Sequence, residues 1–358
     1  MHFGYFTLMG YRERGTPTRQ VLREAAEQVE AADEVGFEYA WFAEHHFSNY
    51  CVCPSPLMMV AHLARTTRRI KLAPAVVVAP LYHPLRLLGE IGLADSLCDG
   101  RLVLGVGSGY QPFEFDRFGI DLADSKEMME EFLDLLTLAF TQETFTFAGK
   151  HYRFPETAIT AQTVNGVPEI WIAGDNPVLH RLAARRGYVP LFTGRVFGSE
   201  YQEKMRALVD RSYAEEGVAP EHTPLGVQRY LCVTSNRRET LDYVDNVRHQ
   251  SRLASNLRRR EQVTDGSMMI EQPFPDEPSL EQIADKVLVG DCETIAERLC
   301  EEIRRARPSH VMFHCQVGGS GHTQAMHTIE RFATDIQPML ERELGPLAAL
   351  GPPLPVAA

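Results

Sequence analysis

The chain has 358 residues, of which 44% are hydrophobic, so it can bury a large core and is long enough for an eight-fold α/β barrel with insertions. A formal net charge of -12 argues against nucleic acid as a partner, because phosphate backbones are normally bound by a basic face. No run approaches the roughly 18 apolar residues of a membrane span, and the start, MHFGYFTLMGYRERG, is too short and too interrupted to be a signal peptide.

The first half of the chain alternates short apolar runs with amphipathic helices. Thr16 is expected to cap the first helix, with Pro17 in its first turn and Gly36 at its end. After a glycine-rich loop, Asp124 and Glu127 have the spacing of a capping box at the start of the fourth helix. Strands are expected at His2–Thr7, Glu38–Phe42, Ile70–Val78 and Arg101–Val106, and the second and third helices at Pro56–Thr67 and Pro84–Leu97.

The same unit repeats in the second half. Eight strand–helix units in register favour a single closed (β/α)8 TIM barrel over residues 1–342, and an open doubly wound sheet is the alternative. The last residues, 343–358, are expected to be a disordered tail. Strands are expected at Glu169–Ala173, Val189–Phe192, Leu225–Val233 and Ser309–His314, with a helix at Val178–Arg186 after the first of these.

Two long connections interrupt the repeat. Gln142–Pro168 is expected to make an irregular or hairpin excursion before strand five. The second, about 237–290, follows strand seven and contains a charged helix at Asn256–Glu261 and a polar, proline-rich run with Met268 and Met269. Segments after barrel strands lie at the C-terminal face, so the second connection is either a lid over the site or a disordered surface insertion.

Seven cysteines are scattered along the chain. Cys51 and Cys53 form a C-x-C pair, but no second pair has the spacing of a zinc site. We therefore expect reduced core thiols in a cytoplasmic protein and no metal site.

Strand two ends in WFAEHHF, which places two histidines next to each other. Side chains alternate along a strand, so His45 and His46 should point in opposite directions, one into the barrel mouth and one away from it. A histidine at this end of a barrel strand suits general acid–base chemistry, because its unperturbed pKa is about 6.5. Taken alone, the pair could equally be hydrogen-bonded structural histidines.

Two further stretches have residues suited to flat or anionic ligands. The loop Gly105–Tyr110 follows strand four, and its three glycines would let the backbone approach a ligand, although an ordinary turn explains them as well. It lacks the G-x-G-x-x-G spacing of a dinucleotide-binding turn. Strand five ends in IAGDNP just before a helix, whose free amides would suit a phosphate.

Taken together, these motifs resemble the alpha subunit of bacterial luciferase and its flavin-dependent relatives. The resemblance rests on four stretches in order and at compatible spacing: FAEHHF, Ala79–Glu90 (APLYHPLRLLGE), Gly100–Gly119 (GRLVLGVGSGYQPFEFDRFG) and Gly290–Leu299 (GDCETIAERL). It implies that reduced FMN, supplied by a separate flavin reductase, binds at the C-terminal mouth. It also implies that O2 is captured as a C4a-(hydro)peroxyflavin and that oxygen is transferred to a small organic substrate.

By position, the resemblance also implies roles for individual residues. His45 matches the family's catalytic histidine and is preceded by Glu44. Ala75-Val76 falls where the family has a non-prolyl cis peptide beneath the flavin ring, and Lys126 matches a basic contact to the phosphate. The implied cofactor-binding residues are Ala75, Val76, Gly107, Ser108, Gly109, Tyr110, Lys126, Gly174, Asp175 and Asn176.

The chain departs from luciferase in its phosphate contacts. Gly107 replaces a cysteine and Ser108 replaces an arginine, so one phosphate clamp is lost. Gly174-Asp175 replaces a glutamate-serine pair, and the carboxylate of Asp175 should repel a phosphate. We expect Asp175 to cap the next helix, with the backbone amides from Asn176 onward facing the ligand.

Two other functions fit the resemblance. The chain could be a deazaflavin-dependent dehydrogenase that transfers hydride and ignores oxygen, or a non-catalytic flavin-binding subunit. FAEHHF and the HPLR stretch favour FMN, and the presence of His45 favours an enzyme. Relatives pair through helices that match Pro56–Thr67 and Pro84–Leu97, where small residues allow close approach, so we expect a homodimer.

Overall fold

A parallel sheet that curls into a nearly closed barrel forms the centre of the structure. The computed structural model describes residues 1–194 and 196–354. Along the sheet the strands are ordered β3-β2-β1-β14-β10-β9-β8-β5-β4, and every neighbouring pair is parallel. A bridge between Leu72 and Leu102 joins the two ends, so the architecture is the predicted TIM barrel. The strands are β1 (His2–Thr7), β2 (Tyr39–Phe42), β3 (Lys71–Pro74), β4 (Val77–Val78), β5 (Val103–Gly107), β8 (Glu169–Ala173), β9 (Val189–Thr193), β10 (Gly226–Val233) and β14 (His310–His314).

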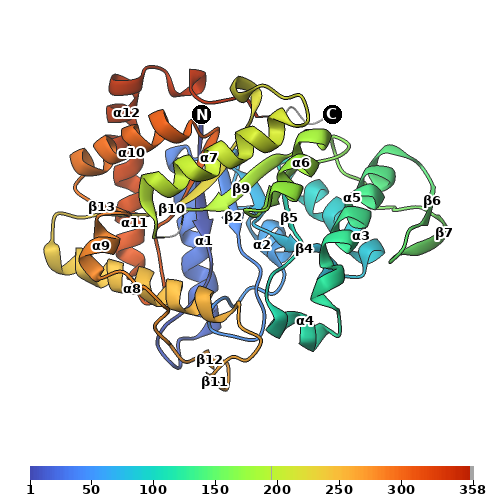
Figure 1. The fold of residues 1–358 in the computed structure, drawn as a ribbon, viewed down its shortest axis with the longest axis horizontal. Helices are drawn as coiled ribbons and strands as arrows, with labels where there is room; N and C mark the ends of the chain where they lie inside the picture. The colour runs from blue at the N-terminus through green and yellow to red at the C-terminus, as the bar shows by residue number, and fades with distance from the viewer. Residues whose placement is uncertain (195, 355–358) are drawn as a thin grey trace.

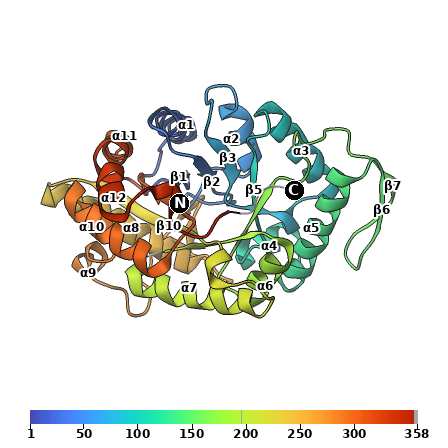
Figure 2. The same ribbon diagram turned by 90° about the horizontal axis from the view of Figure 1, so that it is seen from above.

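Helices surround this barrel, as the view from above shows (Figure 2). The helices are α1 (Thr18–Val35), α2 (Pro56–Leu63), α3 (Pro84–Leu97), α4 (Pro112–Phe118), α5 (Ser125–Thr141), α6 (Pro177–Arg186), α7 (Gly198–Ala214), α8 (Arg237–Asn256), α9 (Leu280–Ala284), α10 (Cys292–Ala306), α11 (His322–Arg331) and α12 (Gln337–Leu344). Helix α1 ends at Gly36, which has the expected left-handed conformation with a φ of 98°. The residue before the helix is Pro17, so the predicted cap at Thr16 is one residue too early.

The predicted third strand, Ile70–Val78, is broken in two. β3 pairs with β2, whereas β4 pairs with β5 on the other side. Between them lies the Ala75–Val76 peptide, which is cis, as the resemblance implied. The break therefore lets one stretch of chain pair with both of its neighbours where the barrel closes.

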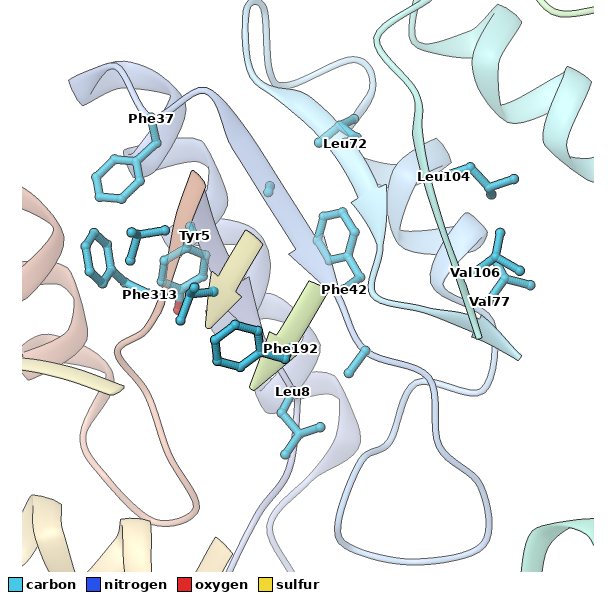
Figure 3. Close-up of a cluster of buried hydrophobic side chains, with 14 of the residues drawn as sticks. Tyr5, Leu8, Phe37, Phe42, Leu72, Val77, Leu104, Val106, Phe192 and Phe313 are labelled. Atoms are coloured by element: carbon cyan, nitrogen blue, oxygen red, sulfur yellow. The ribbon is translucent and has the colours of Figure 1, made fainter. Parts of the chain in front are cut away.

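Apolar side chains fill the space between strands and helices, and aromatic rings close one end of the barrel. Figure 3 shows Tyr5, Phe42, Leu72, Val106 and Phe313 in the cluster of buried hydrophobic side chains. Inside the barrel, the rings of Tyr39, Trp41, Trp171 and His310 lie 4.7 to 6.0 Å from one another, and Trp41 Nε1 donates to His310 Nε2 at 3.0 Å. His310 lies at the start of β14, so these rings seal the N-terminal end.

The long connections contain ordered structure. β6 (Phe145–Ala148) and β7 (Arg153–Thr157) form an antiparallel hairpin, as predicted for Gln142–Pro168. After β10, the predicted insertion contains α8, a short hairpin of β11 (Thr264–Asp265) and β12 (Met268–Met269), α9, and β13 (Leu288–Gly290) beside β10. The charged helix predicted at Asn256–Glu261 is wrong: α8 ends at Asn256, and the arginines after it lie exposed in a turn with no apolar face to pack.

Part of the predicted disordered tail packs against the barrel. Leu347 is buried, and its carbonyl accepts a hydrogen bond from the amino group of Met1 at 2.7 Å. The carbonyl of Pro352 accepts from Ser309 Oγ at 2.7 Å. The residues up to 354 therefore do not form a free end, and residues 355–358 lie outside the described residues. Among the described helices, none is long and apolar enough to cross a membrane.

Candidate active site

The loops that follow the barrel strands meet at the end opposite the aromatic seal. Figure 1 shows α4 and the β11–β12 hairpin at this end of the molecule and the N-terminus at the other. In parallel barrels the loops at the C-terminal ends of the strands form the active site. The predicted site residues on β2, β5 and β8 lie at or just beyond the C-terminal ends of their strands.

His45 lies in the loop after β2 and is held by residues from the loop after β5. The amide nitrogen Nε2 of Gln111 donates to His45 Nδ1 at 2.6 Å, and Oε1 of Glu114 lies 3.3 Å from the same atom. The rings of Tyr50 and Tyr110 meet the imidazole edge-to-face, with centroids 4.8 and 6.0 Å away. An amide nitrogen can only donate, so Nδ1 accepts from Gln111 in this arrangement. These contacts hold the imidazole in one orientation.

Glu44 and His46 point to a different set of partners. The buried Glu44 carboxylate accepts from the Val78 amide at 3.1 Å and from the Tyr82 hydroxyl at 2.9 Å, and it lies 3.1 Å from Nε2 of His46. Burial raises the pKa of Glu44, although these donors oppose the shift. The two imidazoles therefore contact different residues, but both histidines lie beyond β2, which ends at Phe42, so the alternation expected along a strand does not apply to them. Glu44 holds β4 in place rather than contacting His45.

The glycines after β5 make room for other parts of the protein. A Cβ atom on Gly107 would lie 2.6 Å from the side chain of Val76, beside the cis peptide, and one on Gly109 would lie 2.4 Å from the ring of Phe115. The glycines therefore let the loop pack closely against β4 and α4. From the sequence we expected them to serve a ligand or an ordinary turn. Ser108 is buried here, whereas Tyr110 keeps 41% of its surface exposed.

Lys126 lies exposed in the first turn of α5. The capping box predicted there does not form, because Asp124 makes no side-chain cap and Glu127 instead contacts Lys150 and His151 of the β6–β7 connection. Asp124, Glu127 and His151 lie within 4.8 Å of one another and could hold a metal ion. Lys150, however, already supplies a positive charge to Glu127.

The turn after β8 is organised around its backbone. Asn176, not Asp175, caps α6, since its side chain accepts from the Val178 amide at 2.9 Å. The prediction that Asp175 is the cap is therefore wrong by one residue, and Asp175 stays exposed just outside the helix. Nε2 of the buried His180 donates to the carbonyl of Gly174 at 3.0 Å, which holds this peptide in one orientation.

The structure brings some of the predicted residues together and leaves others apart. His45 and Tyr110 meet at the mouth, and Gly107 meets Val76. No hydrogen bond or ion pair among the described residues joins Lys126 to the 174–176 turn. Sequence reasoning missed Gln111, Glu114 and Tyr50, although the polar spacing of Gln111 and Glu114 around Pro112 gave a weak signal.

Comparison with known proteins places this geometry in a family. The family model described as luciferase-like monooxygenase matches residues 1–310. An uncharacterized protein of Sinorhizobium fredii is 36% identical over 96% of this chain and 99% of its own length. The oxygenase component of flavin-dependent trigonelline monooxygenase from Acinetobacter baylyi is 29% identical over 57% of this chain and 58% of its own length.

Two solved structures share the fold. The oxygenating constituent of 3,6-diketocamphane monooxygenase from Pseudomonas putida, in complex with FMN, has a TM-score of 0.78 at 21% identity and covers 94% of this chain and 98% of its own. An F420-dependent secondary alcohol dehydrogenase has a TM-score of 0.72 at 14% identity, over 95% and 98% of the two chains. With the family model matching most of the sequence, this chain is an enzyme of the luciferase-like monooxygenase family.

Proposed function

We propose that the protein is the oxygenase of a two-component system, which uses reduced FMN from a separate flavin reductase and O2 to oxygenate a small organic substrate. The observation that carries the proposal is His45, fixed at the barrel mouth by Gln111 and flanked by two tyrosine rings. The trigonelline relative is named as the oxygenase component of a flavin-dependent enzyme, which supports a reductase partner.

The residues at the mouth fit a flavin. Oε1 of the buried Gln111 has no hydrogen-bond partner among the described residues, so it can accept from a ligand. At the turn after β8, Pro177 has no N–H and the Asn176 side chain occupies the Val178 amide, so the amides of Asp175 and Asn176 just before α6 are the ones assigned to a phosphate. We assign flavin contacts to Ala75, Val76, Gly107, Ser108, Gly109, Tyr110, Lys126, Gly174, Asp175 and Asn176.

In this proposal the bound reduced flavin supplies the electrons that activate O2, and the protein handles protons and excludes water. Nε2–H of neutral His45 can donate to a ligand in the mouth. Glu114 Oε1 lies 3.3 Å from Nδ1 and accepts from the His46 amide at 2.7 Å, so this carboxyl group is fixed beside the imidazole. We assign the acid–base role at the mouth to His45. Glu44 acts as a positioning residue through Val78 and Tyr82.

Anaerobic titration with FMNH2, followed by addition of O2, tests this function against its alternatives. An oxygenase should bind FMNH2 and then consume O2 with product formation. A deazaflavin-dependent dehydrogenase, favoured by the likeness to the F420-dependent enzyme, should bind reduced F420 and leave O2 unused. A non-catalytic subunit should bind flavin but neither consume O2 nor form product.

The phosphate contacts can be tested by substitution at Lys126 and Asp175. A charge-assisted contact to phosphate is typically worth about 1.5–3 kcal/mol, so Lys126→Ala should weaken FMNH2 binding about ten- to a hundredfold. Asp175→Ser should strengthen it, because a repelling carboxylate is lost while the Asn176 cap remains. Reduced riboflavin, which lacks the phosphate, is the control and should bind both variants like wild type. Equal loss of both flavins in Lys126→Ala would make the lysine a structural residue.

We also propose that the segment after α8 is a lid. Asn49 connects this segment to the mouth through two hydrogen bonds of 2.8 Å. Its side-chain oxygen accepts from the backbone N–H of Met269, and its backbone N–H donates to the carbonyl of Ser267. Asn49→Ala should open the β11–β12 hairpin about tenfold more often, because a buried hydrogen bond is lost. The expected signs are faster hydrogen exchange over 264–269 and more H2O2 per FMNH2 consumed. Arg14→Ala, which removes exposed contacts with the side chain and carbonyl of Asp265 rather than a buried hydrogen bond, is the control; identical behaviour of the two variants would argue against the lid.

A homodimer through α2 and α3 is the third proposal. Met58, Leu93 and Leu97 are 71%, 54% and 51% exposed on these two helices, which is unusual for large apolar residues unless they meet a partner. Sedimentation should give twice the mass of the chain, and Leu93→Glu should shift it to the monomer. Val178→Glu, at an apolar residue of α6 that is 47% exposed, should remain dimeric. A wild-type monomer at micromolar concentration would contradict this arrangement.

A further inference from the structure

A chain of polar contacts runs from His45 to helix α8. Gln111 bonds to His45, and the Tyr110 and Tyr50 hydroxyls interact with Gln111 and with each other. The Tyr50 hydroxyl also interacts with Gln250, a buried residue of α8. The loop after β2, the loop after β5 and helix α8 therefore share one polar network on this side of the mouth.

This network leaves buried hydrogen-bonding capacity unused. Nε2 of Gln250 is buried, and its contact with the Tyr50 hydroxyl is not a full hydrogen bond, so this donor is left unsatisfied among the described residues. Buried donors in folded proteins are normally paired, so a donor left unsatisfied beside a ligand site is suited to an acceptor on the ligand. Gln250 therefore offers N–H groups to a ligand acceptor on the side of the mouth that faces α8.

Arg258 adds a positive charge beside Tyr110, another member of this network. Its guanidinium lies over the ring of Tyr110, 5.4 Å from the centroid. Neighbouring arginines are otherwise engaged: Arg259 donates to Gln272 and Arg260 lies 3.7 Å from Asp116. Arg258 has no carboxylate within ion-pair distance among the described residues. In a protein of net charge -12, a guanidinium held on an aromatic ring without a counter-ion is suited to an incoming anion.

We propose that the substrate of this site is a small organic carboxylate, bound by Arg258 and the amide of Gln250 and held against Tyr50 and Tyr110 beside His45. The inference rests on the proposed function, and it assigns to Arg258 the choice of substrate rather than the binding of flavin phosphate, which is placed at Lys126 and the turn after β8. A guanidinium pairs with a carboxylate through two parallel hydrogen bonds, which a neutral amide cannot reproduce.

Benzoate and its neutral counterpart benzamide are the probes, titrated calorimetrically into the full-length protein saturated with FMN at constant ionic strength. Benzoate should bind at least tenfold more tightly than benzamide. Arg258→Gln should abolish this preference, whereas Arg259→Gln, which removes the same charge from the adjacent position, should keep it. Gln250→Leu should weaken both probes alike, because both have a carbonyl oxygen for the amide.

The outcomes separate this inference from the proposed function. If benzamide binds wild type as well as benzoate does, or if Arg258→Gln keeps the preference, the carboxylate site is wrong while FMNH2 oxidation is unaffected. If Arg258→Gln weakens FMN but not riboflavin, Arg258 is a phosphate contact and the inference also fails. If the wild type does not bind FMNH2 in the anaerobic titration, the proposed function fails, and the preference for benzoate, measured in the flavin-free protein, still tests Arg258.

Discussion

Replacing His45 by alanine is expected to lower turnover about 10²–10⁴-fold, the range for losing a positioned acid–base group. The fold should survive, because the imidazole is bonded to side chains of one neighbouring loop and leaves a gap at the mouth rather than in the core. Flavin should still bind, since none of the proposed phosphate contacts involves His45. Product formation under saturating FMNH2 and O2 measures the effect.

The matched control for this variant is His62→Ala, a histidine on the surface of α2 whose loss should leave turnover within twofold. Gln111→Leu should have an intermediate effect, because it frees the imidazole without removing it. Its pH profile should change along with its rate, which a merely structural role would not cause. Product formation equal to wild type in His45→Ala would remove the catalytic assignment.

The largest loss of stability is expected when the buried ion pair between Arg229 and Glu302 is broken. Arg229 is fully buried on β10, and its guanidinium donates to the two Glu302 oxygens at 2.7 and 3.0 Å and to the Lys286 carbonyl at 2.6 Å. Glu302→Ala would leave a buried charge without a counter-ion, which costs about 3–5 kcal/mol. Urea unfolding should show this as a lower midpoint with little change in slope.

Two further variants show whether burial is the cause. The exposed pair Arg304–Glu343 is the control, and Glu343→Ala should cost less than about 1 kcal/mol. The double variant Arg229→Met, Glu302→Leu should recover most of the loss, because it removes both charges and keeps the volume. If Glu302→Ala lowers the free energy of unfolding no more than Glu343→Ala does, this account is contradicted.

Where a segment's structure depends on its own residues, the sequence predicted it well. Periodicity alone predicted the bounds of β1, β8 and α3. The errors arise where distant parts of the chain compete. Glu127 has the spacing of a capping box, but the hairpin supplies Lys150 and His151 as partners. The run PAVVVAP looks like one continuous buried strand, and only the closure of the barrel shows why it divides at Ala75–Val76.

The candidate site follows the same rule. The family motif pointed to His45, whose ring contacts Gln111, whereas the ring of His46 contacts Glu44. Strand alternation does not account for this difference, because both histidines lie beyond β2. The residues that orient His45 could not be foreseen, because Gln111 and Tyr50 reach it only when the loops after β2 and β5 meet. Gln250 belongs to a helix two hundred residues later in the chain, and no local pattern relates it to Tyr50.

The rings of Tyr39, Trp41, Trp171 and His310 fill the N-terminal end of the barrel, so the site is open only at the C-terminal mouth. Every small molecule that enters the site must leave by the same route. A cofactor that binds deeper than the substrate has to arrive first and depart last, so the oxidised cofactor is held until the product has gone. Excess substrate would then delay each round by blocking that exit, and turnover should decline at high substrate concentration.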